Sequence, residues 1–215
     1  MMRKFVWFLP LLLLEAAACR AQRVPEKLKY ELLESILNTL PRPFAYAKRG
    51  TDGKYHRLPP MATDTPTVRL LLLDHPYSSD DDYQVVLARD GTYERAQVLQ
   101  YFSLADVAYM RQQLPASQTF KFEQSKIRQP GVTVLSLDTL TALNQRLGQR
   151  AHILMRDSLL QRYGSEQPFF VGGILFSKDH KRALVNVGGD GWETSVYSNT
   201  GTGWRREATL YVVEY

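Results

Sequence analysis

Residues 169–187 read FFVGGILFSKDHKRALVNV, which is two apolar segments on either side of a short polar one. The first apolar segment, Phe169 to Phe176, has the length of a buried strand, and so does the second, Arg182 to Val187. Ser177 to Lys181 supplies polar residues of the kind that form turns. The stretch predicts an antiparallel hairpin, because strands joined by so short a turn pair with each other.

The residues after this hairpin extend it into a meander. A glycine-rich loop, GGDG at 188–191, comes before two strand candidates, Glu193 to Ser198 and Leu210 to Tyr215. A second glycine-containing loop, TGTGW at 200–204, separates these candidates. The GGDG loop lacks the lysine and following helix of a phosphate-binding loop and the spacing of a dinucleotide fingerprint. Positive φ angles, which glycine adopts without strain, explain the glycines of GGDG more simply, and TGTGW fits a second flexible loop.

The residues before the hairpin alternate predicted helices with predicted strands. Apolar spacing and capping residues predict helices at Pro25 to Leu40, from Ser103 with Asp106 in a capping box, from Asp138 as a cap, and at Ala151 to Tyr163 before Gly164. Short apolar runs predict hairpins at 44–58 (turn Asp52-Gly53) and 83–98 (turn Asp90-Gly91), and strands at Val68 to Leu73, Phe120 to Glu123 and Val132 to Leu135. We therefore predict an α+β fold, an antiparallel sheet with a C-terminal β-meander and three or four flanking helices.

The first residues have the three-part pattern of an export signal. Arg3 and Lys4 precede the apolar run FVWFLPLLLL, which is too short for a membrane span of roughly 20 residues. Two routes of processing stay open. Cleavage after Ala21 would remove 1–21 as a signal peptide, whereas a lipobox leader ending before Cys19 would leave that cysteine lipidated. We expect an exported protein, periplasmic or secreted, or a lipoprotein anchored through Cys19, with 22–215 as a single α+β domain.

Charge and cysteine content exclude several classes of function. The whole chain has a net charge of +5, of which residues 1–21 contribute +2, so the mature chain is near +3. This balance is too weak to indicate a nucleic-acid partner. Cys19 is the only cysteine, so the mature domain has neither an internal disulfide nor a cysteine metal site. We expect no cofactor, and contact with a membrane only through lipidation.

The segment DHPYSSDDD at 74–82 is the densest group of potential metal ligands. Asp74, His75, Asp80, Asp81 and Asp82 offer carboxylate oxygens and one imidazole. Calcium is bound by oxygens from alternating positions of a turn, and three consecutive aspartates do not follow that pattern. We favour a solvated charge run, with the metal site as the alternative.

Ser177, Asp179 and His180 are the residue types of a hydrolytic triad. A triad needs the histidine between the nucleophile and the carboxylate, which a single tight turn rarely permits. We therefore interpret Asp179 as a turn residue. The scattered histidines have no metal-binding spacing either.

Aromatic residues mark two candidate ligand-binding surfaces. If the two glycine loops lay at one edge of the sheet, Trp192 and Trp204 would border a cleft for carbohydrate or peptide, although core tryptophans are the favoured interpretation. Tyr46 and Tyr55 lie among basic residues of the first predicted hairpin. That hairpin could attract anionic envelope polymers, or be a solvated sheet edge, which we favour.

The segment ILMRDSLLQRYG, followed by FVGGILFSKDHKRALVNV, resembles a group of bacterial exported proteins of unknown function. The resemblance covers about a quarter of the chain. It implies a helix, an F-S-K-D-type hairpin and an ALV strand, and then a strand with a tryptophan, a place that Trp204 would fill. It implies no catalytic residue.

These observations favour a non-catalytic binding or structural module of the bacterial cell envelope. Its partner would be an envelope polymer or another envelope protein. One alternative is an envelope-acting hydrolase assembled from distant loops, with Asp74, His75, Asp179 and His180 as its candidates. A second alternative is a secreted interaction partner or inhibitor, which would expose a contiguous apolar patch.

Overall fold

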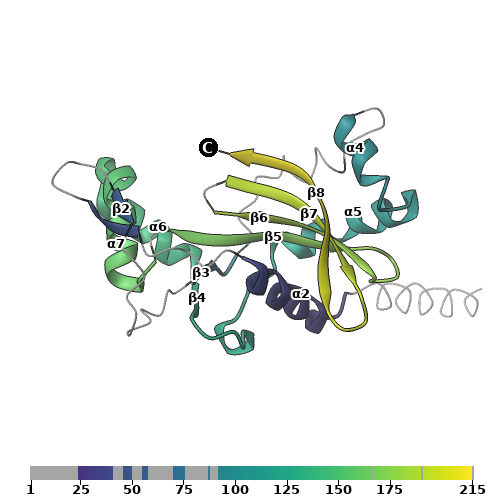
Figure 1. Cartoon of the computed structure of the whole chain (residues 1–215), viewed down its shortest axis with the longest axis horizontal. Coiled ribbons are helices and arrows are strands. Elements are labelled where there is room, and N and C mark those ends of the chain that lie inside the picture. Colours follow the sequence, from purple (N-terminus) through teal and green to yellow (C-terminus); the bar gives the residue numbers. More distant parts are fainter. Residues whose placement is uncertain are drawn as a thin grey trace, which may run out of the picture.

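The computed structural model describes residues 24–40, 46–49, 55–57, 70–75, 87, 92–165, 167–189 and 191–214. Six strands form one mixed sheet in the order β4-β3-β5-β6-β7-β8 (Figure 1). Their bounds are β3 Leu70–Leu73, β4 Val132–Leu135, β5 Pro168–Phe176, β6 Arg182–Gly188, β7 Gly191–Asn199 and β8 Trp204–Glu214. Helices flank this sheet, so the predicted α+β class is confirmed.

The predicted C-terminal meander is confirmed. Strands β5 to β8 pair antiparallel in sequence order. In the deciding hairpin Phe176 is opposite Ala183, and Leu175 is opposite Leu184. All four of these side chains are fully buried. Strand β6 is buried on both faces, which explains why its sequence is nearly continuously apolar.

The N-terminal strands differ from the prediction of an antiparallel sheet. Strand β3 pairs parallel with β4 on one side and with β5 on the other. Parallel neighbours need long crossover connections. The helices α4 (Tyr93–Val98) and α5 (Leu104–Gln118) and the 3₁₀ turn η1 (Gln124–Lys126) lie between β3 and β4 in sequence. The sheet is therefore mixed, and the antiparallel prediction holds for the meander.

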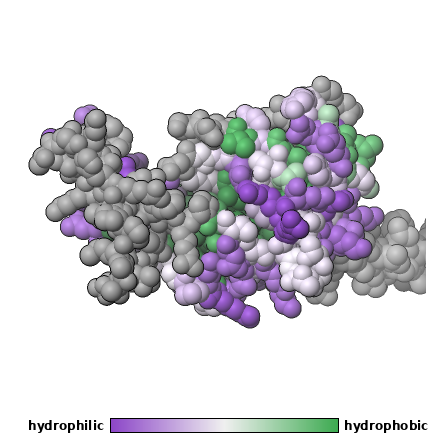
Figure 2. Space-filling view, in the orientation of Figure 1, coloured by the Kyte–Doolittle hydropathy of each residue, from purple (hydrophilic) through white to green (hydrophobic). Residues whose placement is uncertain are grey.

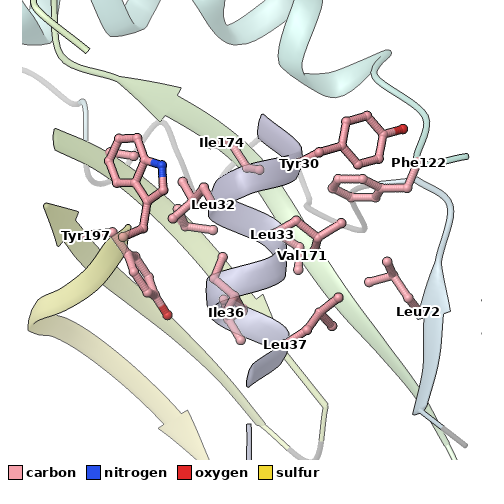
Figure 3. Packing of buried hydrophobic residues seen from close by; sticks show 14 of the residues in the cluster. Tyr30, Leu32, Leu33, Ile36, Leu37, Leu72, Phe122, Val171, Ile174 and Tyr197 are labelled. Carbon is pink, nitrogen blue, oxygen red and sulfur yellow. The ribbon is translucent and has the colours of Figure 1, made fainter. Parts of the chain in front are cut away.

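Helix α2 (Glu26–Thr39) confirms the first predicted helix and covers one face of the sheet. It lies across the meander strands (Figure 3). Leu32, Leu33 and Ile36 are fully buried against β5 and β6 residues such as Val171 and Val185. Each such side chain contributes roughly 1.5–3 kcal/mol relative to exposure, so this face anchors the helix.

Other helices cover the opposite face. Val107 and Met110 of α5, with Val98 of α4, pack on Leu175 and Leu184. A further cluster joins Leu71 and Leu73 of β3 to helices α6 (Leu137–Leu147) and α7 (Ala151–Tyr163), which are linked by the 3₁₀ turn η2 (Gly148–Arg150). Helices on both faces leave the ends of the meander strands as the places where polar groups gather.

Three local predictions are wrong. Residues 93–98, expected in a hairpin, form α4, because Thr92 caps a run of good helix formers by accepting a bond from the Arg95 N–H. Residues 120–123 form no strand, since their backbone bonds are single ones, such as Phe122 N–H to Asp74 O at 2.8 Å. The side chain of Ser136 caps α6 instead of that of Asp138.

Other predictions hold or lie outside the described residues. Strands β1 (Tyr46–Arg49) and β2 (Tyr55–Arg57) pair antiparallel, as the first hairpin predicted. The Asp52-Gly53 and Asp90-Gly91 turns and the whole leader, Cys19 included, lie outside the described residues. Within the described part of the chain, no helix has the length and apolar character to cross a bilayer.

Candidate functional site: a polar cleft at one end of the meander

The turn between β5 and β6 is built on the side chain of Ser177. Its buried hydroxyl donates to Asp179 Oδ1 at 2.7 Å and accepts from the Arg182 N–H at 2.9 Å. The Lys181 N–H donates to the same Asp179 oxygen at 3.0 Å. Asp179 is thus the turn residue that the sequence predicted.

The triad interpretation is wrong, because the imidazole is directed elsewhere. His180 Nε2 lies 3.1 Å from the hydroxyl of Tyr109 in α5, and its ring packs on Phe176. The backbone of His180 has φ 57°, in the left-handed region. Ser177 therefore meets the carboxylate directly, with no base between them to activate it.

Beside this turn lies a cleft of about 300 Å³, which we call the turn cleft. The β5–β6 turn and the start of β6 form one part of it, and the N-terminal end of α5 and the C-terminal end of β7 form the rest. Its lining residues are Tyr101, Asp106, Ser177, Asp179, Lys181, Arg182, Ser198 and Asn199. Three segments far apart in sequence thus converge on one polar depression.

Asp106 fixes the wall that α5 contributes. Its carboxylate accepts from the Ser103 N–H at 3.0 Å, and the Asp106 N–H donates to Ser103 Oγ at 3.2 Å, so the predicted capping box is complete. The carboxylate also accepts from the Ser103 hydroxyl at 2.7 Å. It also accepts from the Lys178 N–H at 2.8 Å, and so ties the turn to the helix. Partial burial raises the pKa of Asp106, but these hydrogen bonds outweigh that effect and lower it overall.

Asp179 is also held as a carboxylate. The hydrogen bonds from the Lys181 N–H and the Ser177 hydroxyl stabilise its charged form and lower its pKa. Both acids of the turn cleft are thus charged at neutral pH. Neither carries a raised pKa of the kind that makes a carboxylic acid a proton donor in catalysis.

A β-bulge positions Glu207, which contacts the lining residue Arg182. Val196 pairs with Ala208 and Tyr197 pairs with Arg206, so Glu207 is an extra residue in β8. Glu207 accepts from Arg182 Nε at 3.1 Å and Nη2 at 3.3 Å, and Arg182 Nη1 donates to Tyr101 O at 3.1 Å. Bulges commonly redirect a side chain in this way. Sequence reasoning missed this contact, because no local pattern marks the bulge.

Several side chains of the cleft keep hydrogen-bonding capacity. Within the described residues, Lys181 Nζ, Ser198 Oγ and Asn199 Nδ2 make no hydrogen bond or ion pair. Asn199 Oδ1 accepts from the Gly201 N–H at 2.9 Å, which orients its amide nitrogen. The cleft therefore combines a fixed frame with available polar groups. Such an arrangement can bind a polar ligand, and it lacks an activated nucleophile.

Comparison of the chain with protein-family models, with curated proteins and with solved structures finds no match. The resemblance to exported proteins of unknown function therefore stays a prediction. The turn cleft has to be interpreted from its own geometry.

The acidic segment is partly described, and its described part is structural. Asp74 Oδ1 accepts from the Leu137 N–H at 2.8 Å and lies 3.2 Å from His75 Nδ1, so it holds the start of α6. Asp80, Asp81 and Asp82 lie outside the described residues. No group of three or more potential metal ligands occurs among the residues that the structure describes.

The four candidate residues of the hydrolase alternative lie in two groups that are far apart in the structure. Leu72 of β3 pairs with Phe169 of β5, and Phe176 lies seven residues further on. At about 3.3 Å per residue, that is about 23 Å. Asp74 and His75 follow β3 near the start of β5, whereas Asp179 and His180 follow its end. This version of the hydrolase is therefore wrong.

The tryptophan cleft is also wrong. Trp192 lies at the start of β7, whereas Trp204 pairs with Asn199 at its end. In a meander successive turns lie at opposite ends of the shared strand, so the two glycine loops cannot border one edge. Trp204 is a buried core residue, with its ring 5.6 Å from that of Phe176. The side chains of Tyr46 and Tyr55 lie outside the described residues.

Proposed function

We propose that the mature chain is a non-catalytic binding module of the bacterial cell envelope, and that it binds through the turn cleft. The observation that carries the proposal is that some polar groups of the lining are bonded to the backbone whereas others are available to a ligand. Ser177, Asp106 and Asp179 are committed to holding the backbone, while Lys181, Ser198 and Asn199 are available. Because these groups are already held in place, the cleft loses little conformational entropy when it binds a ligand.

Retention of envelope material tests this proposal. Residues 22–215 would be immobilised and exposed to envelope extract, and the retained polymer and protein would be identified by mass spectrometry and sugar analysis. The Lys181→Met variant removes an available cation from the cleft. Lys178→Met removes an exposed lysine from the same turn, outside the cleft lining, and is the matched control. We expect retention by the wild type and the control, and reduced retention by Lys181→Met.

The alternative of a protein partner has its own observation and its own outcome. Figure 2 shows hydrophobic side chains at the surface near α4. Leu104, the first residue of α5, is 64% exposed, and Tyr93 of α4 is 73% exposed. Retention of a protein that is lost in Leu104→Ser but kept in Lys181→Met would support an interaction partner or inhibitor. Retention of nothing by the wild type would overturn the binding module itself.

We also propose that the chain is exported, on the strength of its leader. Replacing Cys19 with Ser separates the two routes of processing. Fractionation of cells that express each form would show either unchanged soluble release or a shift from the membrane to the soluble fraction. The first result indicates cleavage by signal peptidase, the second indicates lipidation at Cys19, and retention in the cytoplasm contradicts export.

A further inference from the structure

We infer that the ligand of the turn cleft is a neutral saccharide unit of an envelope glycan. This inference rests on the proposed function and names its ligand. It is carried by the charge balance of the cleft, its mixture of hydrogen-bonding groups and its size.

The charges that line the cleft cancel. Asp106 and Asp179 are carboxylates, and Lys181 and Arg182 are cations. Glu207, which is not a lining residue, contacts Arg182 with both carboxylate oxygens and fixes the position of its guanidinium. An acidic polymer would meet two carboxylates, and a cation would meet Lys181 and Arg182. The cleft therefore favours a polar ligand without net charge.

The available groups match hydroxyls and amides. Lys181 and Asn199 present donors, Ser198 presents a hydroxyl that donates and accepts, and carboxylate oxygens accept. A sugar hydroxyl donates and accepts at the same atom, so neighbouring hydroxyls can engage such a mixed set. Tyr101 adds a partly buried aromatic side chain to the lining, which can pack on the apolar face of a sugar ring.

The size and rigidity of the turn cleft also favour a small saccharide. About 300 Å³ is at the lower end of small-molecule sites, which suits a mono- or disaccharide. The hydrogen bond that the Asp106 carboxylate accepts from the Lys178 N–H joins the α5 wall to the β5–β6 turn. The hydrogen bond that Arg182 donates to Glu207 of β8 holds the side chain of Arg182 in place. The polar groups are therefore positioned before any ligand arrives.

Titration of the mature domain with defined sugars tests the inference. The neutral probes are N-acetylglucosamine, its β-1,4-linked disaccharide, maltose and cellobiose. The charged probe is galacturonic acid, and the peptide probe is trialanine. Heteronuclear NMR would follow backbone amides of the 177–182 turn and of Ser198 and Asn199. We expect saturable shifts at these amides with at least one neutral sugar.

Matched variants connect binding to the cleft. We expect Lys181→Met and Asn199→Ala to weaken that affinity by about tenfold each, the usual effect of one lost hydrogen bond to a charged or well-oriented group. Lys178→Met should leave it within about twofold, and so should a change from 50 to 500 mM salt, because a neutral ligand has no charge to screen.

The outcomes separate this inference from the function on which it rests. Binding of galacturonic acid or trialanine in place of every neutral sugar would overturn the saccharide assignment, and so would the absence of binding by all probes. If envelope material were still retained and lost in Lys181→Met, the binding module would stand with a different ligand. If no envelope material were retained either, both would fail.

Discussion

Two strands of the sheet end on the same pair of residue types, and the structure uses the pairs differently. Asp74 and His75 follow β3, and Asp179 and His180 follow β5. Asp74 receives the first N–H of α6, whereas Asp179 receives a hydroxyl and an N–H within its own turn. His75 contacts its neighbouring carboxylate, while His180 reaches across to Tyr109.

The difference shows that the role of each aspartate depends more on the surroundings of its carboxylate than on its residue type. The side chain of Asp74 is only 13% exposed and sits at a helix N-terminus, where it serves as an anchor. Asp179 is exposed and forms part of a turn that borders a cleft. The first pair is thus structural, whereas Asp179 of the second pair lines the candidate binding site.

The largest losses of stability should come from truncating the buried residue that lies beneath each Asp-His pair. Phe176 is fully buried under His180, and Leu73 is 2% exposed before Asp74. We expect Phe176→Ala to lower the free energy of unfolding by about 3–5 kcal/mol and Leu73→Ala by about 2–5 kcal/mol, because each leaves a cavity. Urea unfolding followed by circular dichroism measures both.

Leu104→Ala is the control for these truncations, since this leucine is 64% exposed. It should change the free energy of unfolding by no more than about 0.5 kcal/mol. A loss below about 1 kcal/mol in Phe176→Ala would contradict the tight packing of Phe176 beneath the β5–β6 turn.

The next largest effect should distinguish the Asp74-His75 pair from the Asp179-His180 pair, because it concerns stability and not ligand affinity. Removing Asp74 leaves the Leu137 N–H without its acceptor in a partly buried place, so Asp74→Ala should destabilise the fold by about 1–3 kcal/mol. Asp74→Asn keeps an acceptor oxygen and should recover most of that loss. Saccharide affinity at the turn cleft should be unchanged in both. A stable Asp74→Ala variant would remove the contrast between anchor and cleft.

The smallest effect should be a pH dependence contributed by the cleft carboxylates. The folded pKa values of Asp106 and Asp179 lie below their ordinary value of 3.8. As the pH falls, the unfolded chain takes up protons first, so their stabilisation is complete above 3.8 and is lost as the pH drops through the folded values. Asp179 is exposed, so solvent screening keeps its share small.

Unfolding free energies at pH 7 and pH 3 would measure this dependence. The double variant Asp106→Asn, Asp179→Asn should lose less stability between these pH values than the wild type. An equal loss in both proteins would show that other groups carry the acid sensitivity of the fold.

Much of the fold could be predicted, because its signals are local. The alternation of apolar runs and turn residues located β5, β6, β7 and the C-terminal part of β8, and the Ser103–Asp106 spacing located the start of α5. The failures share a cause. Residues 93–98 have a short apolar pattern that is compatible with a strand or a helix. Thr92 favours the helix, because its side chain caps the N-terminus of α4. Residues 120–123 form no strand because the backbone hydrogen bonds described for them are single ones, such as that from the Phe122 N–H to Asp74 O.

The site was less predictable than the fold. The turn role of Asp179 follows from residue type, and the sequence indicated it. The convergence of Tyr101, Asp106 and Asn199 on that turn depends on packing of α5 and on the register of β7. Glu207 could not be found at all, since its position depends on a bulge between two strands.

The sequence by itself determined most of the segments that become helices and strands, the antiparallel meander and, through its single cysteine, the lack of an internal disulfide. Apolar spacing, turn residues and cysteine content are properties of short stretches or of composition, so they can be read without coordinates. Only the tertiary structure decided that β3 pairs parallel with both neighbours, that the two tryptophans lie at opposite ends of β7, and that a polar cleft forms beside Ser177. These outcomes depend on contacts between residues far apart in the chain, whose pairing and register no local pattern specifies.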